Sequence, residues 1–466
     1  MTADIAGCKA ALAHLDLDDN PATVRQKSRD FFWYSPPLKA RMDHLTADFV
    51  VAPKSEAEVV AALAAAYAHD VPVTTRGAGT GNYGQAMPLS GGMILHTKAM
   101  TAVKEIGPGR VRVEAGAIIA DVDRETRAQS GQELRLHPST YHTASIGGFI
   151  AGGSGGVGSI RWGGLRDAGN ILKLRLVTME AEPRVIELTG DAIHKASHAY
   201  GVNGIITEVE MPLAPAYEWI DLLVGFDAWE DANRYASDMA HQDGLLLKEL
   251  ATVAAPAPHA YFLRHKPFIP EGAHVAIATV ADHALDAALA VTARHKAARV
   301  LFRSDRDWTE GLPPGFELAW NHTTLRALRV DPKITYLQVL YAGDPVAKLS
   351  EMQRLFGDEV PGHAEWVRFN GAVVAMGLPL VRYTTEARLE EIMALHEAHG
   401  CPIFNPHRYT LEEGGMKQSD PVQLAFKRET DPKGLLNPGK MIAWDDPDYD
   451  FDKGGFYLFP GMTAVE

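Results

Sequence analysis

The first residues with a recognisable chemical pattern are the glycines of TTRGAGTGNYGQ, residues 74–85. Gly79, Gly81 and Gly84 have the spacing G-x-G-x-x-G, which lets the loop of an NAD-binding unit approach a pyrophosphate. That interpretation requires a strand before the glycines and a helix directly after them, whose N-terminus holds the phosphate. The residues before the loop meet the requirement: a capping box with Ser55 as N-cap and Glu58 reaching back predicts a helix, and residues 71–75 read as a short strand.

The residues after Gly84 do not meet it. QAMPLSGG contains a proline and two glycines and leads into the β-like MILHT, so no helix fits there. No acidic residue that would bind a ribose lies between 71 and 104, and Glu105 follows no helix. An ordinary tight turn would need fewer glycines. We therefore expect a loop whose backbone N–H groups surround a pyrophosphate directly.

A second glycine-rich stretch, SIGGFIAGGSGGVGSIRWGGLRD, covers residues 145–167, and nine of the eighteen residues from Gly147 to Gly164 are glycine. Glycines at this density let the backbone approach a flat or charged ligand without interference from Cβ atoms. Strand-like segments flank the stretch, and a helix closed by Gly131 precedes it. Two glycine loops joined by alternating strands and helices predict an α+β domain around an extended ligand with a phosphate in its middle.

The elements that must position these loops belong to a chain of 466 residues, a length that predicts two or three domains. The net charge of −14 disfavours nucleic acid and anionic membranes as partners. Cys8 and Cys401 form no metal-ligand or redox pair, which favours a reducing compartment. The acidic N-terminus is unlike a signal peptide, and no run of eighteen apolar residues occurs, so a cytoplasmic protein without a membrane span is expected.

Five segments in this order make the sequence recognisable: PVTTRGAGTGNYG, VRVEAGAIIADVDR, SIGGFIAGGSGGVGSIRWGGLRD, YGVNGIITE and DPKGLLNPGK. Together they resemble the FAD-linked oxidase superfamily, the group with vanillyl-alcohol oxidase, p-cresol methylhydroxylase and glycolate oxidase. The resemblance implies an α+β fold with a two-lobed FAD-binding domain of the p-cresol methylhydroxylase type, residues 1–215 completed by 420–466. It also implies a substrate-binding cap domain over 216–419, with an antiparallel sheet covered by helices.

The resemblance also implies which residues contact FAD. The pyrophosphate loop would be Arg76, Gly77, Ala78, Gly79, Thr80 and Gly81. Further contacts would come from His137, Pro138, Ser139, Ser145, Ile146, Gly147, Gly148, Gly152, Trp162, Gly204, Ile205, Ile206 and Asn437. Lys440 in NPGK would reach the pyrimidine edge of the flavin, with a solvated lysine as the alternative; for Trp162 the alternative is core packing. Some members tether FAD through a histidine close behind the first glycine loop. The matching position is Thr80 or Asn82, so FAD is expected to be noncovalent.

The catalytic candidates lie in two further segments. In FNPHRYTLEEGG, His407 matches the histidine of a G-E-H-G-type stretch and is a candidate base, and Arg408 or Tyr409 would bind a carboxylate or an oxyanion. The glutamate that precedes this histidine in metal-dependent members is Pro406 here, and the H-x-x-G-D-G-N-x-H segment is missing, so a metal-free site is expected.

The second segment is WNHTTLRALR, where His322 and its polar neighbours would line a pocket. The alternative is a helix start with Asn321 or Thr323 as N-cap. The expected function is an FAD-dependent oxidoreductase that oxidises a hydroxy acid or an alcohol, by hydride transfer to flavin N5, and passes electrons to oxygen, a quinone or a protein carrier. A homodimer is expected. A vanillyl-alcohol-type phenol oxidase and a flavin-carrying electron-transfer subunit are the alternatives.

Overall fold

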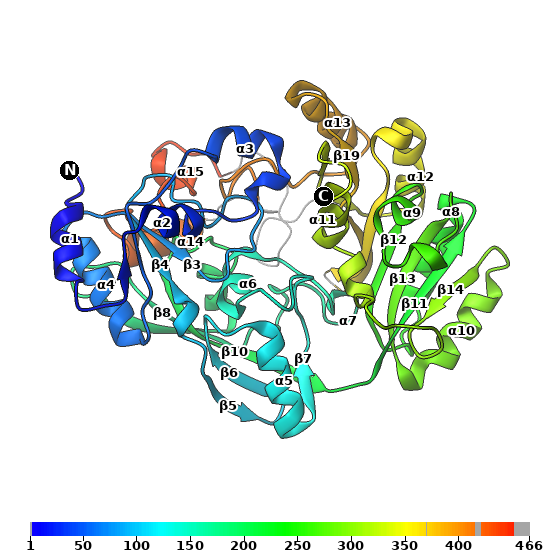
Figure 1. The fold of residues 1–466 in the computed structure, drawn as a ribbon, viewed down its shortest axis with the longest axis horizontal. Helices are drawn as coiled ribbons and strands as arrows, with labels where there is room; N and C mark the ends of the chain where they lie inside the picture. The colour runs from blue at the N-terminus through cyan, green and yellow to red at the C-terminus, as the bar shows by residue number, and fades with distance from the viewer. Residues whose placement is uncertain (1, 370, 415–420, 452–466) are drawn as a thin grey trace. The chain divides into compact units, whose positions relative to one another are not determined.

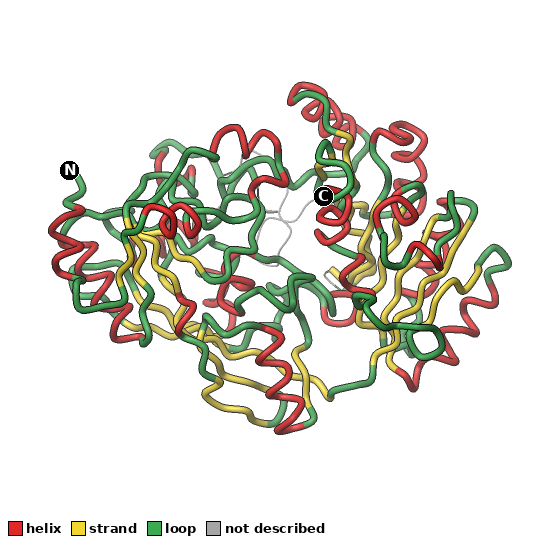
Figure 2. The backbone as a smooth tube through the Cα atoms, viewed as in Figure 1, coloured by secondary structure: helices red, strands yellow, loops and turns green. Residues whose placement is uncertain are grey.

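The computed structural model describes residues 2–369, 371–414 and 421–451, which form two compact units (Figure 1). Unit 1 comprises Met1–Ser154, Leu165–Ala216 and Asn405–Glu466, and unit 2 comprises Gly155–Gly164 and Tyr217–Phe404. The second glycine-rich stretch is thus divided between the units. Helices and strands, red and yellow in Figure 2, occur in both, so the expected mixed fold class is confirmed.

The first sheet of unit 1 carries the first glycine loop. Its strands, in the order β1-β2-β4-β3, are β1 (Leu17–Asp18), β2 (Phe49–Val51), β4 (Met93–His96) and β3 (Val73–Arg76). β2 and β3 both run parallel to β4, and α4 (Glu56–Ala68) connects them. Ser55 caps α4 as expected, accepting from Glu58 N at 3.3 Å, whereas the Glu58 carboxylate accepts from Lys54 N. The loop begins where β3 ends.

The second sheet of unit 1 is antiparallel and follows the order β5-β6-β10-β8-β9, with β7 paired to β10. Its strands are β5 (Val103–Gly107), β6 (Arg110–Glu114), β10 (Ile205–Pro215), β8 (Lys173–Val177), β9 (Val185–Thr189) and β7 (Gln132–Leu134). The helix α5 (Ile119–Ser130) ends at Gly131, which has the left-handed conformation expected of a C-terminal glycine.

Helices also occur within the second glycine-rich stretch, where a bare loop was expected. The structure has α6 (Ile146–Gly152) and α7 (Ser159–Trp162) there. The expectation was wrong because glycines can shorten the distance between a helix and its neighbour as well as loosen a loop. A Cβ atom on Gly147 would lie 2.5 Å from the Cβ of Ala115, so this glycine permits α6 to lie against the end of β6.

The C-terminal part of unit 1 returns to the first sheet. Within α14 (Pro421–Thr430), the Lys427 ammonium donates to Val202 O, to Leu436 O and, at 2.7 Å, to the Asp431 carboxylate. Asp431 also accepts from the backbone N–H groups of Leu435 and Leu436. This buried pair therefore fastens the segment around NPGK beside β3, where Asn437 N donates to Val73 O.

Unit 2 is built on one antiparallel sheet in the order β14-β11-β13-β12-β17-β18-β16. The strands are β14 (Arg299–Arg303), β11 (Trp219–Phe226), β13 (His274–Ala281), β12 (Leu247–Val253), β17 (His363–Phe369), β18 (Ala372–Gly377) and β16 (Val339–Tyr341). A small second sheet pairs β15 (Ile334–Tyr336) with β19 (Leu380–Arg382).

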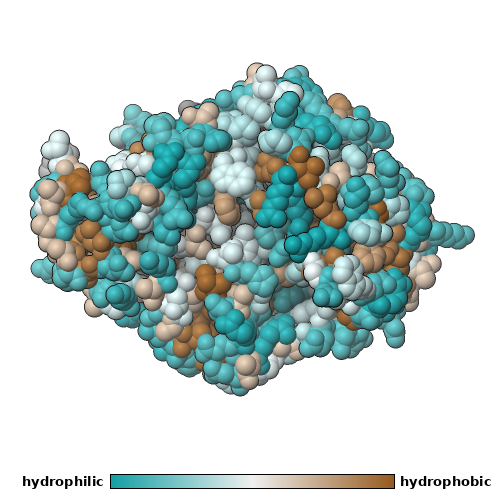
Figure 3. Space-filling view, viewed as in Figure 1, coloured by the Kyte–Doolittle hydropathy of each residue, from teal (hydrophilic) through white to brown (hydrophobic). Residues whose placement is uncertain are grey.

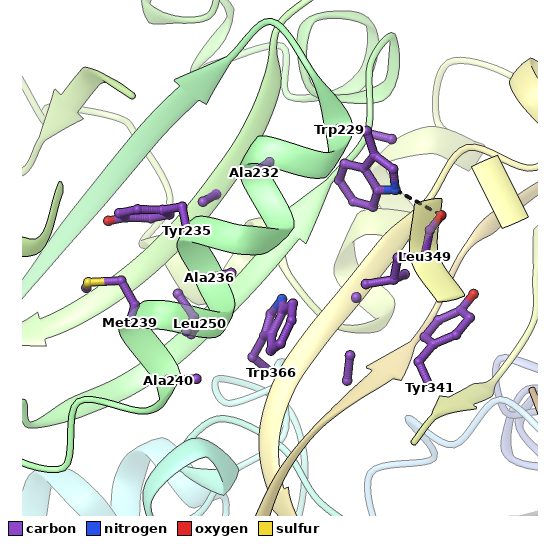
Figure 4. Packing of buried hydrophobic residues seen from close by; sticks show 14 of the residues in the cluster. Trp229, Ala232, Tyr235, Ala236, Met239, Ala240, Leu250, Tyr341, Leu349 and Trp366 are labelled. Carbon is purple, nitrogen blue, oxygen red and sulfur yellow. Dashed lines mark hydrogen bonds between the residues drawn. The ribbon is translucent and has the colours of Figure 1, made fainter. Parts of the chain in front are cut away.

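The two faces of the large sheet carry different cores, as the alternation of side chains along a strand requires. One face is covered by α8 (Trp229–Ala240), α10 (Leu285–Arg294), α12 (Pro345–Phe356) and α13 (Glu386–Ala398). Figure 4 shows the small and aromatic side chains of α8 against this face, with the Trp229 indole donating to Leu349 O. The other face packs against α9 (Ala257–Tyr261), a 3-10 turn, Gly315–Leu318, and α11 (Asn321–Leu328).

Hydrophilic residues cover most of the surface seen in Figure 3, with hydrophobic residues in small groups. Among the described residues, no helix combines the length and the apolar character needed to cross a bilayer.

Candidate functional site

The first glycine loop is held in place by Arg76, the last residue of β3. The Arg76 guanidinium donates to Lys27 O at 3.0 Å, to Arg29 O and to Ala78 O at 3.2 Å. Gly79 has φ +74, and a Cβ atom there would lie 2.1 Å from the guanidinium. Arg76 is 8% exposed, so it braces the loop from within. Its expected contact with FAD stays a prediction.

The loop presents a run of backbone N–H groups. Among the described residues, the N–H groups of Gly79, Thr80, Gly81 and Asn82 have no hydrogen-bond partner. These residues lie in no helix or strand, and Gly79, Thr80 and Gly81 are half-buried. Unpaired amides in succession are the chemistry that accepts the oxygens of a diphosphate. The loop therefore fits the pyrophosphate of FAD.

The second glycine stretch adjoins the first. Ser145 Oγ accepts a hydrogen bond from Ala78 N at 3.3 Å, and a Cβ atom on Gly77 would lie 2.0 Å from that oxygen. A Cβ atom on Gly152 would lie 3.6 Å from Gln85 Nε2, so α6 also passes beside the end of the first loop. The Gly148 N–H has no partner among the described residues. Both loops thus contribute backbone donors to one cradle.

Within this cradle, Ile146 and Gly147 are fixed by backbone hydrogen bonds, Ile146 N to Ala117 O at 2.9 Å and Gly147 N to Ala115 O at 2.8 Å. These bonds pair the start of α6 with the segment that follows β6. Gly147 N–H is therefore used inside the protein, and it is the neighbouring Gly148 that offers its N–H.

The remaining residues expected to contact FAD occupy several parts of the chain. His137 is buried, with its Nδ1 3.0 Å from Pro138 O, and Ser139 is buried beside it. Ile205 and Ile206 are buried at the start of β10, after Gly204, whose φ of +124 favours glycine. Trp162 is the one member of the set that lies in unit 2, where Arg161 stacks on its ring. Their contacts with FAD stay predictions.

Asn437 and Lys440 donate hydrogen bonds to the backbone at the end of the first loop. The Asn437 amide donates to Gln85 O at 2.8 Å and to Tyr200 O at 2.7 Å. The fully buried Lys440 ammonium donates to Gly84 O at 2.5 Å and lies 5.1 Å from the Tyr409 ring centroid. The structure thus gives both side chains partners inside unit 1, and the solvated position considered for Lys440 is wrong because NPGK packs under the loop.

A buried carboxylate lies near this lysine. Asp30 accepts from Phe32 N at 2.9 Å and from Ala86 N at 3.1 Å. Burial raises the pKa of Asp30 and lowers the pKa of Lys440, and in each case the opposite charge of the other opposes the shift. Sequence reasoning missed Asp30 because nothing in RDFFWY signals a contact with a loop more than fifty residues later.

The three catalytic candidates of the C-terminal segment also lie in unit 1. His407 is 2% exposed, and its Nδ1 lies 2.8 Å from the hydroxyl of Ser35, which caps α3 (Pro36–Met42). Arg408 is partly exposed, 4.0 Å from the Glu413 carboxylate, and Tyr409 packs beneath Lys440. Since Ser35 Oγ accepts from Leu38 N, it can accept from His407 Nδ1–H as well, which leaves Nε2 as the basic atom of the ring.

His322 lies apart from those candidates in the sequence and belongs to unit 2, on α11. The N-cap of this helix is Trp320, so the expectation of Asn321 or Thr323 as N-cap is wrong. Asn321 is already the first helical residue, and the Thr323 hydroxyl donates to Leu318 O at 2.6 Å instead of capping the helix. His322 is half-buried.

Next to Trp320, the structure brings together an acidic cluster that sequence reasoning missed. Glu249 on β12 accepts from the Trp320 indole at 2.9 Å, and Glu365 on β17 accepts from Trp320 N at 2.5 Å. His363 Nε2 lies 2.7 Å from Glu365 Oε1. Burial, and then the other carboxylate, raise the pKa of Glu249 well above its ordinary value, and burial raises that of Glu365. His363 and Glu365 lie two residues apart on β17, but Glu249 lies on β12, more than a hundred residues earlier in the chain, so no spacing in the sequence reveals the cluster.

A metal site would need several titratable side chains close together. Within residues 2–369, 371–414 and 421–451, no three His, Cys, Asp or Glu side chains lie where they could hold one metal ion. The metal-free site remains a prediction.

Comparisons with known proteins agree with the cradle. The model of the FAD binding domain family matches residues 47–187, which contain both glycine-rich stretches in full. The D-lactate dehydrogenase of Archaeoglobus fulgidus is 30% identical over 220 residues, covering 45% of this chain and 48% of that protein. The glycolate oxidase subunit GlcD of Escherichia coli K12 is 32% identical over 201 residues, covering 41% and 39%. The chain therefore matches less than half the length of these relatives.

Among solved structures, an alkyldihydroxyacetonephosphate synthase superposes with a TM-score of 0.70 over 91% of this chain and 82% of that chain. The two sequences are 16% identical, so this likeness concerns the fold alone. Residues 47–187 form an FAD binding domain, as the two glycine stretches indicated, and the similarity of the chain to the D-lactate dehydrogenase and to GlcD covers less than half of its length.

Proposed function

We propose that the chain is an FAD-dependent oxidoreductase that oxidises a small organic substrate bearing a hydroxyl group, a hydroxy acid in the first place. The observation that carries the proposal is the cradle of unpaired N–H groups at Gly79–Asn82 and Gly148, inside the matched FAD binding domain. The names of two relatives, a D-lactate dehydrogenase and a glycolate oxidase subunit, favour hydroxy acids over other alcohols.

FAD, when bound, supplies the two-electron acceptor for a hydride from the substrate carbon. The residues of the chain would bind the cofactor and the substrate and accept the proton. The amides of the first loop and of Gly148 would hold the pyrophosphate, and Gly77 and Gly147 would keep the two segments close enough to share it. Thr80 and Asn82 stand where a histidine would form the covalent bond to FAD, which favours noncovalent FAD.

The proton of the substrate hydroxyl needs a base. We propose His407 Nε2, because the Ser35 hydroxyl can fix Nδ1 in its protonated form and orient the ring. Arg408 and Tyr409, the next two residues, would bind the substrate carboxylate or a developing oxyanion. For His322, on α11 of unit 2, the lining of a substrate pocket stays a prediction.

The test is anaerobic reduction of the FAD-loaded full chain by a panel of 2-hydroxy acids, primary alcohols and phenols, followed by the loss of the flavin absorbance. Bleaching by a hydroxy acid or an alcohol is the expected result. Bleaching by phenols alone would replace the proposal by a phenol oxidase of the vanillyl-alcohol type. The matched control is His407→Gln, which we expect to keep FAD and to be bleached roughly a hundredfold more slowly or worse.

A second candidate function has one observation in its favour. One relative, GlcD, is by its name a subunit of a larger enzyme. A flavin-carrying electron-transfer subunit would bind FAD and stay oxidised with every member of the panel, but would be bleached by a one-electron donor.

A further inference from the structure

The acidic cluster of unit 2 lies within a core where charged groups are costly. Glu249 is 3% exposed and Glu365 is 0% exposed. Ala251 is paired with Glu365 across β12 and β17, and Glu249 is two residues from Ala251, so both carboxyl groups point to the same face of the sheet. That face is the one that packs against α11.

The contacts of the cluster indicate the number of its protons. Glu365 and Glu249 accept from the backbone N–H and the indole N–H of the same Trp320, and Glu365 raises the pKa of Glu249, so the two buried carboxyl groups keep one proton between them. His363 Nδ1 lies 3.1 Å from Leu378 O, which only accepts, so Nδ1 carries hydrogen. The contact between His363 Nε2 and Glu365 Oε1 then needs a second proton. With two protons, the cluster of two carboxyl groups and one imidazole is uncharged.

Among the residues that the structure describes, no cation of the adjoining elements replaces these protons. Glu365 Oε2 is buried and finds no hydrogen-bond donor among the described residues. The charged side chains of the adjoining elements are engaged elsewhere: Arg326 with Glu317 at 3.0 Å, Lys248 over the Trp219 ring, and the exposed Arg161 over Trp162. His322, half-buried on α11, is the remaining titratable neighbour. Loss of the proton between the carboxyl groups would leave two like charges in contact.

Trp320 depends on this pair. Its φ of 51 and ψ of −146 are unusual for a residue with a Cβ atom, and such a conformation persists only when its surroundings hold it. Its carbonyl oxygen accepts from Thr323 N at 3.2 Å, and both of its N–H groups donate to the pair, the backbone N–H to Glu365 and the indole N–H to Glu249. The far edge of the indole adjoins the glycine segment of unit 2: a Cβ atom on Gly155 would lie 3.9 Å from Trp320 Cη2. That segment is bound to β12 through Gly158 N and Lys248 O, at 2.7 Å.

We propose that Glu249 and Glu365 are positioning residues: as a proton-sharing pair they hold Trp320 against the glycine segment 155–164, and they release it when the shared proton is lost. Repulsion between two carboxylates would separate them, and Trp320 cannot then keep both bonds. The segment continues directly from the α6 end of the FAD cradle, so this device would set the substrate-binding geometry as a function of pH. In that last respect it rests on the proposed function.

The test follows Trp320 without substrate or turnover. The full chain is labelled with 5-fluorotryptophan, and the fluorine resonance absent from Trp320→Phe is assigned to Trp320. We expect this resonance to shift in a one-proton transition between about pH 5 and about pH 9, and to stay constant in Glu249→Gln and Glu365→Gln. The control is Glu317→Gln, an acid of the same layer outside the pair, in which the transition should persist. A Trp320 resonance that is constant in the wild type, or that titrates equally in Glu249→Gln, would overturn the proposal.

If the glutamine variants do not fold, infrared spectroscopy of the wild type tests whether the carboxyl pair holds a proton. The carbonyl stretch of a protonated, solvent-excluded carboxylic acid is expected at neutral pH and should disappear as the Trp320 resonance shifts; its absence at neutral pH contradicts the proposal. The pH profile of kcat/KM, once a substrate is found, should show the same transition. A chain that titrates here but is never reduced by hydroxyl substrates refutes the proposed function and leaves this inference intact.

Discussion

The two units handle polar chemistry in opposite ways. Unit 1 builds its cradle from backbone N–H groups, and its buried ions, such as Lys427 and Asp431, are paired and serve to hold the chain in place. Unit 2 buries two carboxyl groups and a histidine together, and burial raises the pKa of both carboxyl groups, from which we infer that protons instead of counter-ions keep them neutral. The difference predicts that unit 1 is sensitive to steric and ion-pair changes, and unit 2 to pH.

The largest effect should follow from breaking the buried ion pair of unit 1. Lys427→Met leaves the Asp431 carboxylate buried without its cation and frees the NPGK segment from beside β3, at a cost of about 3–5 kcal/mol in the free energy of unfolding. Urea denaturation measures it. The matched control is Lys433→Met, which breaks a partly exposed pair with Asp70 and should cost about 1 kcal/mol or less. Equal losses in the two variants would contradict the account.

The pH response of unit 2 comes next in size. Burial raises the pKa of Glu365 from 4.5 to about 7, so the folded protein holds a proton there that the unfolded chain has released. The contribution of this group to stability is complete below about pH 4.5 and is lost as the pH rises through about 7, an effect of at most roughly 3 kcal/mol. Glu365→Gln should therefore flatten the fall in the free energy of unfolding over this range. A fall of the same size in the variant would exclude Glu365 as its source.

A smaller effect is expected from crowding the cradle. Gly147→Ala places a methyl group 2.5 Å from Ala115 Cβ and 2.8 Å from its carbonyl oxygen, which should cost about 1–3 kcal/mol and weaken FAD binding. In the same helix, the nearest atom to a Cβ on Gly152 is 3.6 Å away, so Gly152→Ala should leave the free energy of unfolding unchanged or slightly higher. FAD titration and thermal unfolding of the two variants compare them. Equal FAD affinities and equal unfolding temperatures in the two variants would show that α6 does not need its close approach to Ala115.

The smallest effect concerns the orientation of His407. Ser35→Ala removes both the cap of α3 and the partner of His407 Nδ1, and should cost about 1 kcal/mol in the free energy of unfolding. Thr385→Ala, which removes the cap of α13 in unit 2, should cost a similar amount. Only Ser35→Ala should also lower the rate of anaerobic flavin reduction. An equal rate in both variants would argue against His407 as the base.

The glycine segments of the FAD cradle could be predicted from the sequence, whereas the acidic cluster of unit 2 could not. Each glycine segment is a continuous stretch of the sequence, so its pattern can be recognised directly. The residues after Gly84 do not fit a helix, and this distinguished a nest of amides from an NAD fingerprint. The strands and helices around them follow from local patterns of capping, periodicity and turn residues. The acidic cluster of unit 2 was out of reach because Glu249, His363 and Glu365 come from two strands that a crossover brings together, and neither strand shows a motif.

Other misses have physical causes of the same kind. Asp30 was not found because its contact with Ala86 joins segments far apart in the chain. The helix α6 was missed because glycine disfavours isolated helices, whereas packing against Ala115 selects it here. The position of Lys440 could not be predicted, since burial of an ammonium under Gly84 O depends on the return of the C-terminal segment to the first sheet.

The central claim is that the amides of the two glycine segments hold FAD without a covalent bond. The visible absorption spectrum of the purified full chain, taken before and after acid precipitation, tests it most directly. We expect flavin bands in the native protein and free flavin in the supernatant afterwards. A colourless protein that also fails to take up added FAD would contradict the account, and colour retained in the pellet would contradict the noncovalent cradle.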